Sequence, residues 1–156
     1  MTAKTYLFLT GAALAALLGL FYAGVSTVDF ITHLDRQIHP VSCSLLPGEA
    51  PDSLLDPAQE GCKVAMMSPY SSFAREHYWG GIPWSLPALG VYGFGFILAL
   101  WGIVSRRAHY PGTGAFLFAT GAVAGVSSGV FAYLALTELE TLCKTCMGSY
   151  IASGGL

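Results

Sequence analysis

Residues 110–137 read YPGTGAFLFATGAVAGVSSGVFAYLALT, a run of 28 residues without a formal charge. A helix needs about 20 apolar residues to cross the ~30 Å hydrocarbon core of a bilayer. Residues 78–105 form a second uncharged run of 28 residues, and residues 5–28 form a third of 24 residues. A soluble helix rarely stays apolar on all sides for so long. We therefore predict three transmembrane helices, at about 5–28, 81–105 and 111–137.

The composition of the whole chain agrees with a lipid environment. Charged residues make up 10% of the 156 residues and hydrophobic residues 54%, whereas soluble domains contain about 25% charged residues. The mean hydropathy is +0.59. A net charge of −2 provides no basic surface for nucleic acid, so that class of partner is excluded. We expect an all-α transmembrane bundle that forms a single membrane domain over residues 1–156.

Glycine and proline inside the spans predict how the helices meet. Gly121, Gly125 and Gly129 repeat at intervals of four, a spacing that lets helices approach closely in lipid. We expect this stripe to pack within the bundle rather than to form a dimer contact. Pro83 falls near the first turn of the second span, and Pro87, one turn later, is expected to bend it. A cleavable signal peptide is the alternative for residues 5–28, although 24 residues is long for a signal core.

The flanking charges predict the orientation. Lys4, Arg106 and Arg107 flank the spans on one side without acidic residues, so we expect that side to be cytoplasmic. The connection at 29–80 is acidic and is expected to face outward as an outer loop. Within it, residues 62–74 (CKVAMMSPYSSFA) predict a short interfacial helix. In a bacterium the outer face is the oxidising one.

Four cysteines are predicted to lie on this outer face: Cys43 and Cys62 in the outer loop, and Cys143 and Cys146 after the third span. The second pair forms a C-x-x-C motif, a spacing that lets two thiols close a small disulfide. A zinc site would need a second closely spaced pair, and Cys43 and Cys62 are 19 positions apart. Two inert structural disulfides remain an alternative. Redox exchange is favoured because a helical bundle in lipid has little need of stabilising disulfides.

Several motifs in the same order resemble the vitamin K epoxide reductase family. The paired loop cysteines Cys43 and Cys62 resemble the loop pair of the family. CKVAMMSPYSSF (62–73) resembles the family's stretch after the second loop cysteine, GGIPWSLPALGVYG (80–93) resembles its entry to the second helix, and LCKTCMGSY (142–150) resembles its C-x-x-C followed by tyrosine. Together these motifs cover residues 43–150, which is much more specific than a C-x-x-C motif alone.

The resemblance implies a membrane thiol-disulfide oxidoreductase that supports disulfide bond formation. Cys146 would meet the quinone, Cys143 would be its disulfide partner and the link to Cys62, and Cys43 with Cys62 would form the shuttle pair. The implied electron acceptor is a quinone, ubiquinone or menaquinone. The implied partner is an extracytoplasmic thioredoxin-fold oxidoreductase, and the implied location is the bacterial inner membrane with the cysteines facing the periplasm.

The resemblance also implies a quinone pocket. Tyr150 and Ser68 stand where the family places polar groups at the pocket, and Met66 would lie beside them. The plainer interpretations are an interfacial anchor for Tyr150 and a helix cap for Ser68. Further candidates for the lining of the ring site are Tyr70, Phe73 and Trp84.

Two features depart from the family pattern. The loop cysteines are farther apart than usual, and only ten residues follow Cys146, enough for ~15 Å of helix. We therefore expect a truncated fourth helix from about residue 143, with the pocket completed by a longer chain or by another membrane subunit. No fused thioredoxin domain is expected. These departures leave two alternatives open: a structural or accessory subunit with inactive disulfides, and a redox sensor without turnover.

Overall fold

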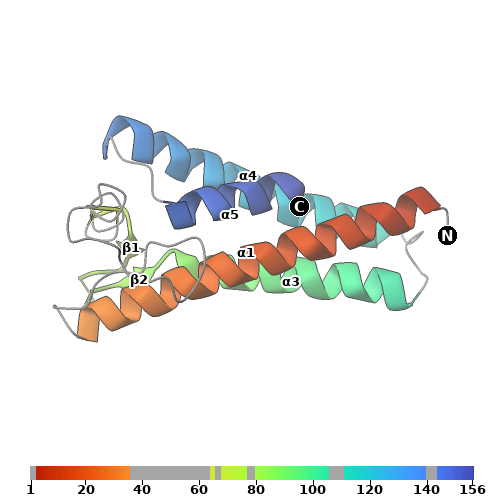
Figure 1. Cartoon of the computed structure of the whole chain (residues 1–156), viewed down its shortest axis with the longest axis horizontal. Helices are drawn as coiled ribbons and strands as arrows, with labels where there is room; N and C mark the ends of the chain where they lie inside the picture. Colours follow the sequence, from red (N-terminus) through yellow and green to blue (C-terminus); the bar gives the residue numbers. More distant parts are fainter. Residues whose placement is uncertain (1–2, 36–63, 66–67, 77–79, 106–110, 140–143) are drawn as a thin grey trace.

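The computed structural model describes residues 3–35, 64–65, 68–76, 80–105, 111–139 and 144–156 (Figure 1). Over these residues the structure consists of helices and one short hairpin. The elements are α1 (Ala3–Asp35), β1 (Ser72–Phe73), β2 (Ile82–Pro83), α3 (Ser85–Val104), α4 (Pro111–Thr137) and α5 (Lys144–Gly155).

The three predicted spans are confirmed as helices long and apolar enough to cross a membrane. The candidate spans are Ala3–Thr32, Ser85–Val104 and Gly112–Thr137. α1 runs past its uncharged stretch and ends at Asp35. α3 begins at Ser85, two residues after Pro83, and so Pro87 lies in its first turn instead of one turn further in. The missing N–H of Pro87 is harmless there because first-turn N–H groups have no partner within a helix.

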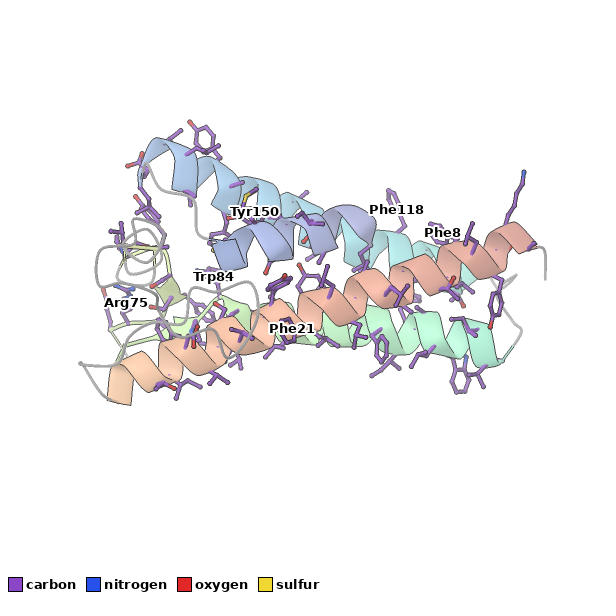
Figure 2. The ribbon with its side chains drawn as sticks, viewed as in Figure 1. Phe8, Phe21, Arg75, Trp84, Phe118 and Tyr150 are labelled. Carbon is purple, nitrogen blue, oxygen red and sulfur yellow. The ribbon has the colours of Figure 1, made fainter. Side chains whose placement is uncertain are left out.

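Large apolar side chains cover the outside of the bundle. Leu7, Ile97 and Phe118 expose 75%, 65% and 78% of their surface. Phe8, Phe21 and Phe118, which come from α1 and α4, mark this outer surface (Figure 2). A soluble protein buries most such side chains, whereas in a bilayer they face lipid of the same polarity. The surface therefore supports the membrane assignment independently of helix length.

The helices α1, α3, α4 and α5 pack lengthwise against one another in one bundle (Figure 1). α1 packs along α3, while α4 contacts α3, and α5 fits between α1 and α4 (Figure 1). The start of α1 lies near the end of α3 and the start of α4. The hairpin, the end of α1 and the start of α5 lie at the opposite end, which is called the hairpin end below.

The contact between α1 and α3 is built from small residues and rings. Ala16 and Ala99 are fully buried. The ring of Tyr92 in α3 lies directly against Gly19 in α1, where a Cβ atom would overlap the ring carbons. At the other end of the pair, a Cβ atom on Gly102 would lie 3.2 Å from a methyl group of Leu9. Glycine and alanine therefore bring these two backbones close together.

The glycine stripe of α4 is a correction to the sequence-based prediction. Gly121 does pack within the bundle, against Leu156, but Gly125 and Gly129 are exposed, and no described atom lies within 4 Å of a Cβ atom built on either. The inward face of α4 is instead formed by Leu117, Thr120 and Ala124. The spacing of four correctly predicts that small residues share a face, yet it carries no information on which face turns inward.

Candidate functional site

Cys146 is the described member of the predicted set of redox cysteines. It is the third residue of α5 and is partly buried, at the hairpin end of the bundle. The backbone N–H groups of a first helical turn favour a thiolate over a thiol, because the helix dipole is positive there. Cys43, Cys62 and Cys143 lie outside the described residues. Their pairing and their distance from Cys146 therefore remain predictions.

α5 begins at Lys144, close to its predicted start at about 143, and has 12 residues. Its inward residues are small. Ala152 is 1% exposed, a Cβ atom on Gly148 would overlap the ring of Tyr22 in α1, and one on Gly155 would lie 3.1 Å from the Cβ of Ala15. These small residues let α5 lie close to α1 and place Cys146 in the wall of the bundle.

A hydroxyl network joins α5 to α3 and α4. The Tyr92 hydroxyl lies 2.7 Å from the Ser153 Oγ and donates to the Ser149 carbonyl oxygen at 3.1 Å. The Ser128 Oγ lies 2.7 Å from the Ser153 Oγ, which donates to the Ser149 carbonyl oxygen at 2.9 Å. Tyr92 and Ser153 are buried, at 4% and 6% exposure. The network therefore links three helices inside an otherwise apolar bundle.

Ser68, predicted as a pocket residue, is buried at 6% exposure in a turn at the hairpin end. Its hydroxyl donates to the Ala65 carbonyl oxygen at 2.8 Å, as the helix-cap interpretation expects. Its own carbonyl oxygen accepts from the Ser71 hydroxyl at 2.9 Å and from the Arg75 guanidinium at 2.6 Å. Ser68 therefore anchors the turn through both its side chain and its backbone.

Arg75 ties this turn to the hairpin (Figure 2). Besides the Ser68 carbonyl, its guanidinium donates to the Ser71 and Ser72 hydroxyls at 2.8 and 2.6 Å, and the Ser72 hydroxyl donates to the Gly80 carbonyl oxygen. β1 pairs antiparallel with β2, so that Phe73 faces Ile82. We call residues 68–76 and 80–83 the cap, because they cover the hairpin end of α3.

Gly81 is needed for the cap to close. Its φ is +78°, a conformation that side chains disfavour, and a Cβ atom there would lie 2.7 Å from the Phe73 carbonyl oxygen. The tight approach brings Phe73 against Trp84, with ring centroids 4.8 Å apart. Trp84 in turn lies 5.8 Å from the ring of Phe131 in α4. The three rings therefore connect the cap, through Trp84 at the start of α3, to Phe131 in α4.

The remaining predicted pocket residues are placed only in part. Tyr150 is partly buried, one helical turn after Cys146 and therefore on nearly the same side of α5 (Figure 2). Phe73 and Trp84 are in contact, whereas Tyr70 is 41% exposed in the cap. Met66 lies outside the described residues; of the predicted interfacial helix, Val64 and Ala65 are helical. The structure thus places Tyr150 near Cys146, and Ser68 and Trp84 in or beside the cap.

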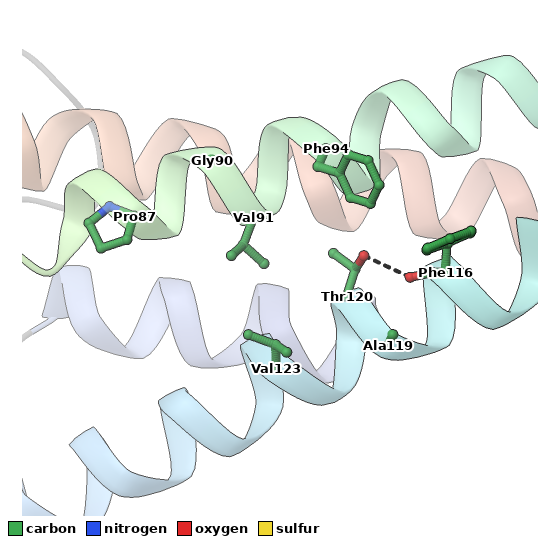
Figure 3. A pocket seen from close by; sticks show the side chains of 8 residues that line it. All are labelled: Pro87, Gly90, Val91, Phe94, Phe116, Ala119, Thr120 and Val123. Atoms are coloured by element: carbon green, nitrogen blue, oxygen red, sulfur yellow. Dashed lines mark hydrogen bonds between the residues drawn. The ribbon is translucent and has the colours of Figure 1, made fainter.

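An apolar groove of about 410 Å³ opens between α3 and α4 (Figure 3). Pro87, Gly90, Val91 and Phe94 line it from α3, at intervals that follow one helix face. Phe116, Ala119, Thr120 and Val123 line it from α4. The Thr120 hydroxyl donates to the Phe116 carbonyl oxygen of its own helix. The groove therefore offers hydrocarbon surface and no free polar group from Thr120.

Sequence reasoning missed Tyr92, Ser128, Ser153 and Arg75. The signal available for the serines was the position of Ser128 inside an uncharged span and the spacing of Ser149 and Ser153, one turn apart. That signal is weak because serine is common in membrane helices. Among the residues that the structure describes, no group of three His, Cys, Asp or Glu side chains is arranged to hold a metal ion.

The fold and the site define a class of protein: a membrane-embedded helical bundle with a cysteine of a C-x-x-C motif at the start of its last helix. Comparison with known families narrows this class. The sequence profile of the vitamin K epoxide reductase family matches residues 11–156, and the chain belongs to that family. No curated protein and no solved structure matched the chain. The family is one of membrane oxidoreductases that generally use quinones.

Proposed function

We propose that this protein oxidises the thiols of a partner protein and passes the two electrons to a membrane quinone, in support of disulfide bond formation. The observation that carries the proposal is the placement of Cys146 in the first turn of α5, within the wall of a lipid-facing bundle, with Tyr150 one turn further along. A thiolate is favoured at such a helix start, and a lipid-soluble quinone reaches it from the side.

The proposed sequence is a relay of thiol-disulfide exchanges. A partner thiolate attacks the Cys43–Cys62 disulfide, and the second partner thiol then closes the partner's new disulfide and releases both loop cysteines. The Cys62 thiolate next attacks Cys143 of the Cys143–Cys146 disulfide and frees the Cys146 thiolate. Cys43 then attacks Cys62, which re-forms the loop disulfide and releases Cys143, and Cys146 delivers two electrons to the quinone as the Cys143–Cys146 disulfide closes. As the two disulfides re-form, one partner dithiol and one quinone have become one partner disulfide and one hydroquinone, with two electrons and two protons transferred.

Four residues are proposed in or beside the quinone pocket. Tyr150 would donate its phenolic hydrogen to a quinone oxygen, because it lies one turn from Cys146 and is partly buried. Ser68 would act through the cap, since its hydroxyl already donates to the Ala65 carbonyl oxygen. Met66 and Trp84 are proposed to contact the ring through apolar surface.

The groove between α3 and α4 is proposed to hold part of the isoprenoid tail. Its lining is apolar and its outer residues Phe94 and Phe116 are 49% and 59% exposed, so that a chain in lipid can enter from the side. Gly90 supplies a test because a Cβ atom there has open space around it. Gly90→Leu should fill the groove and raise the KM for a long-tailed quinone about tenfold while leaving a tail-less quinone unaffected. Gly114→Leu, at an open position of α4 outside the groove, is the control.

The proposed location is the bacterial inner membrane, with the hairpin end facing the periplasm. The support is the position of Lys4 at the opposite end of the bundle, near the start of α1, because cytoplasmic flanks carry the excess of Lys and Arg. A periplasmic thioredoxin-fold oxidoreductase is then the proposed thiol partner. A maleimide that cannot cross the membrane should label Cys146 in reduced spheroplasts, and labelling only after lysis would refute this orientation.

The central experiment measures quinone reduction by purified protein in nanodiscs, with a reduced thioredoxin-fold partner and a ubiquinone or menaquinone analogue. Cys146→Ala should lower the rate at least 100-fold, because Cys146 is the thiol proposed to meet the quinone. Met147→Ala, an exposed neighbour in the same turn, should retain the wild-type rate. Equal rates for wild type and Cys146→Ala would remove Cys146 from the mechanism. Disulfides that resist both the partner and the quinone in the wild type would favour an accessory subunit instead.

A further inference from the structure

We propose that Tyr92, Ser128 and Ser153 are positioning residues, which fix the rotation of α5 about its axis and thereby the place of the Cys146 thiol. The inference deepens the proposed function and rests on it for its catalytic consequence. The claim that these residues fix the position of the thiol follows from the contacts of α5 and does not depend on the proposed function.

Apolar packing by itself constrains the rotation of α5 weakly. The residues that α5 presses into the bundle are Gly148, Ala152 and Gly155. Its large apolar side chains, Met147 and Ile151, are 43% and 67% exposed and point away from the core. Neither of these two side chains can therefore lock the helix into its neighbours. Leu156, which follows the helix, does pack against Gly95 and Gly121, but it lies ten residues beyond Cys146. Lipid supplies no hydrophobic force to choose between rotations, because the tails are as apolar as the side chains.

The hydroxyl network supplies the missing constraint. Ser153 has one hydrogen and two lone pairs, and three oxygen atoms surround it: the Tyr92 and Ser128 hydroxyls and the Ser149 carbonyl. Either Ser153 donates to Ser149 and accepts from the other two, or it donates to Tyr92, which then donates to Ser149. In both arrangements the hydroxyl hydrogens have acceptors. Because neighbouring residues are ~100° apart around a helix, a rotation by one residue would leave these groups unpaired in an apolar medium.

The network is anchored on the most closely packed part of the bundle. The Tyr92 ring lies against Gly19 of α1 and is 4% exposed, so that its hydroxyl cannot follow a rotation of α5. Ser128 makes the second anchor from α4. Hydrogen bonds from two helices therefore hold α5 at the Ser153 hydroxyl, and Tyr92 also holds it at the Ser149 carbonyl oxygen.

The geometry of α5 transmits this constraint to Cys146. Cys146 precedes Ser153 by seven residues, which is nearly two full turns and leaves an offset of only about 20° around the axis. The thiol therefore lies on the same side of α5 as Ser153, towards α3 and α4. Tyr150, the proposed hydrogen donor at the quinone, is carried by the same helix and would move with the same rotation.

The test compares hydroxyl deletions with matched controls. Tyr92→Phe and Ser153→Ala each remove one hydroxyl from the network, whereas Tyr133→Phe and Ser127→Ala remove exposed ones. A further pair of variants compares two side chains of similar volume at position 128. Ser128→Thr retains the hydroxyl, and Ser128→Val does not. Ser128 is only partly buried, so this pair remains informative if the buried variants fail to fold.

Two readouts separate positioning from stability. The first is kcat and KM for the quinone; misplacement of the thiol should lower kcat about tenfold with KM changed less than twofold. The second is the pH profile of Cys146 alkylation in the reduced protein, followed by mass spectrometry, whose limiting rate should change at least about threefold. Ser128→Thr should behave as wild type and Ser128→Val as Ser153→Ala.

Deletions that lower the unfolding temperature but leave both kcat and the alkylation profile at the wild-type values would overturn the inference. Loss of kcat equally in Ser128→Thr and Ser128→Val would also overturn it, since added volume and not the hydroxyl would then be responsible. If the wild type reduced no quinone, the proposed function would fail, and the alkylation profile would still decide whether the network positions the thiol.

Discussion

The seam between α1 and α3 and the seam around α5 hold the same bundle together in different ways. Along α1 and α3 the contact is long and apolar, with alanines at 0% exposure and the Tyr92 ring against Gly19. Around α5 the contact is short, its inward residues are small, and hydrogen bonds through Ser153 link it to α3 and α4. The first seam serves as a framework, and the second positions the helix that carries Cys146.

The difference shows how a membrane protein can fix a reactive group without a large core. Dispersion contacts are numerous but have no preferred direction, whereas a hydroxyl in lipid has few alternative partners. Placing the hydrogen bonds on α5 therefore gives specificity where the chemistry is proposed to occur. Placing the apolar packing on α1 and α3 gives stability elsewhere. Substitutions in each seam test this division.

The largest effect is expected from Gly19→Ala. A Cβ atom at Gly19 overlaps the ring of Tyr92, which is buried and cannot swing away without breaking its hydrogen bonds to α5. Overpacking at this site should lower the free energy of unfolding by about 3 kcal/mol, measured by denaturation in mixed detergent micelles. Gly11→Ala, where a Cβ atom meets nothing within 4 Å, should change it little. A Gly19→Ala protein as stable as Gly11→Ala would show that the seam is not a rigid framework.

A smaller loss is expected from Gly148→Ala in the second seam. Its Cβ atom would overlap the ring of Tyr22, but Tyr22 is only partly buried and can rotate outward. We expect a loss of about 1–2 kcal/mol in the free energy of unfolding and, because α5 shifts, a loss of quinone reduction as well. Gly154→Ala, at an open position of the same helix, is the control. Full activity in a destabilised Gly148→Ala protein would argue that α5 tolerates displacement.

The two seams also differ in how far the sequence predicts them. The helices were predictable because lipid demands long uncharged segments, and residues 5–28 and 110–137 satisfy that demand over their whole length. Cys146 and Tyr150 were predictable as candidates from the C-x-x-C motif and the family resemblance. The facing of α4 was not, since Gly121 and Gly125 look equivalent in the sequence and only Gly121 packs inward. The Tyr92 network was not predictable either, because it joins residues up to 61 positions apart.

Substitution of Arg75 tests whether the cap, a second region held by hydrogen bonds, opens independently of α5. The planar guanidinium of Arg75 donates to the Ser68 carbonyl and to the Ser71 and Ser72 hydroxyls. Lysine cannot reproduce this fork. Because Arg75 is exposed, water compensates in part, and Arg75→Lys should cost about 1 kcal/mol locally. In Arg75→Lys, hydrogen exchange of the cap amides should become about fivefold faster, while exchange of the α5 amides stays unchanged. The control Glu76→Gln should exchange at the wild-type rate in both regions. Faster exchange in α5 as well would mean that the cap and α5 open together.

The smallest effect is expected from Thr27→Val, which removes a hydroxyl bridge from the apolar framework itself. The Thr27 hydroxyl in α1 donates to the Ala23 carbonyl oxygen of its own helix at 2.7 Å and lies 2.8 Å from the Ser85 hydroxyl in α3. Valine keeps the volume, and hydrogen bonds between membrane helices contribute about 0.6 kcal/mol on average. Thr10→Val, which loses only bonds to carbonyls of its own helix, is the matched control. If the long seam is held by packing, Thr27→Val should lower the free energy of unfolding by no more than about that average. A loss as large as that of Gly19→Ala would show that the framework depends on hydrogen bonds as α5 does, and the contrast between the seams would disappear.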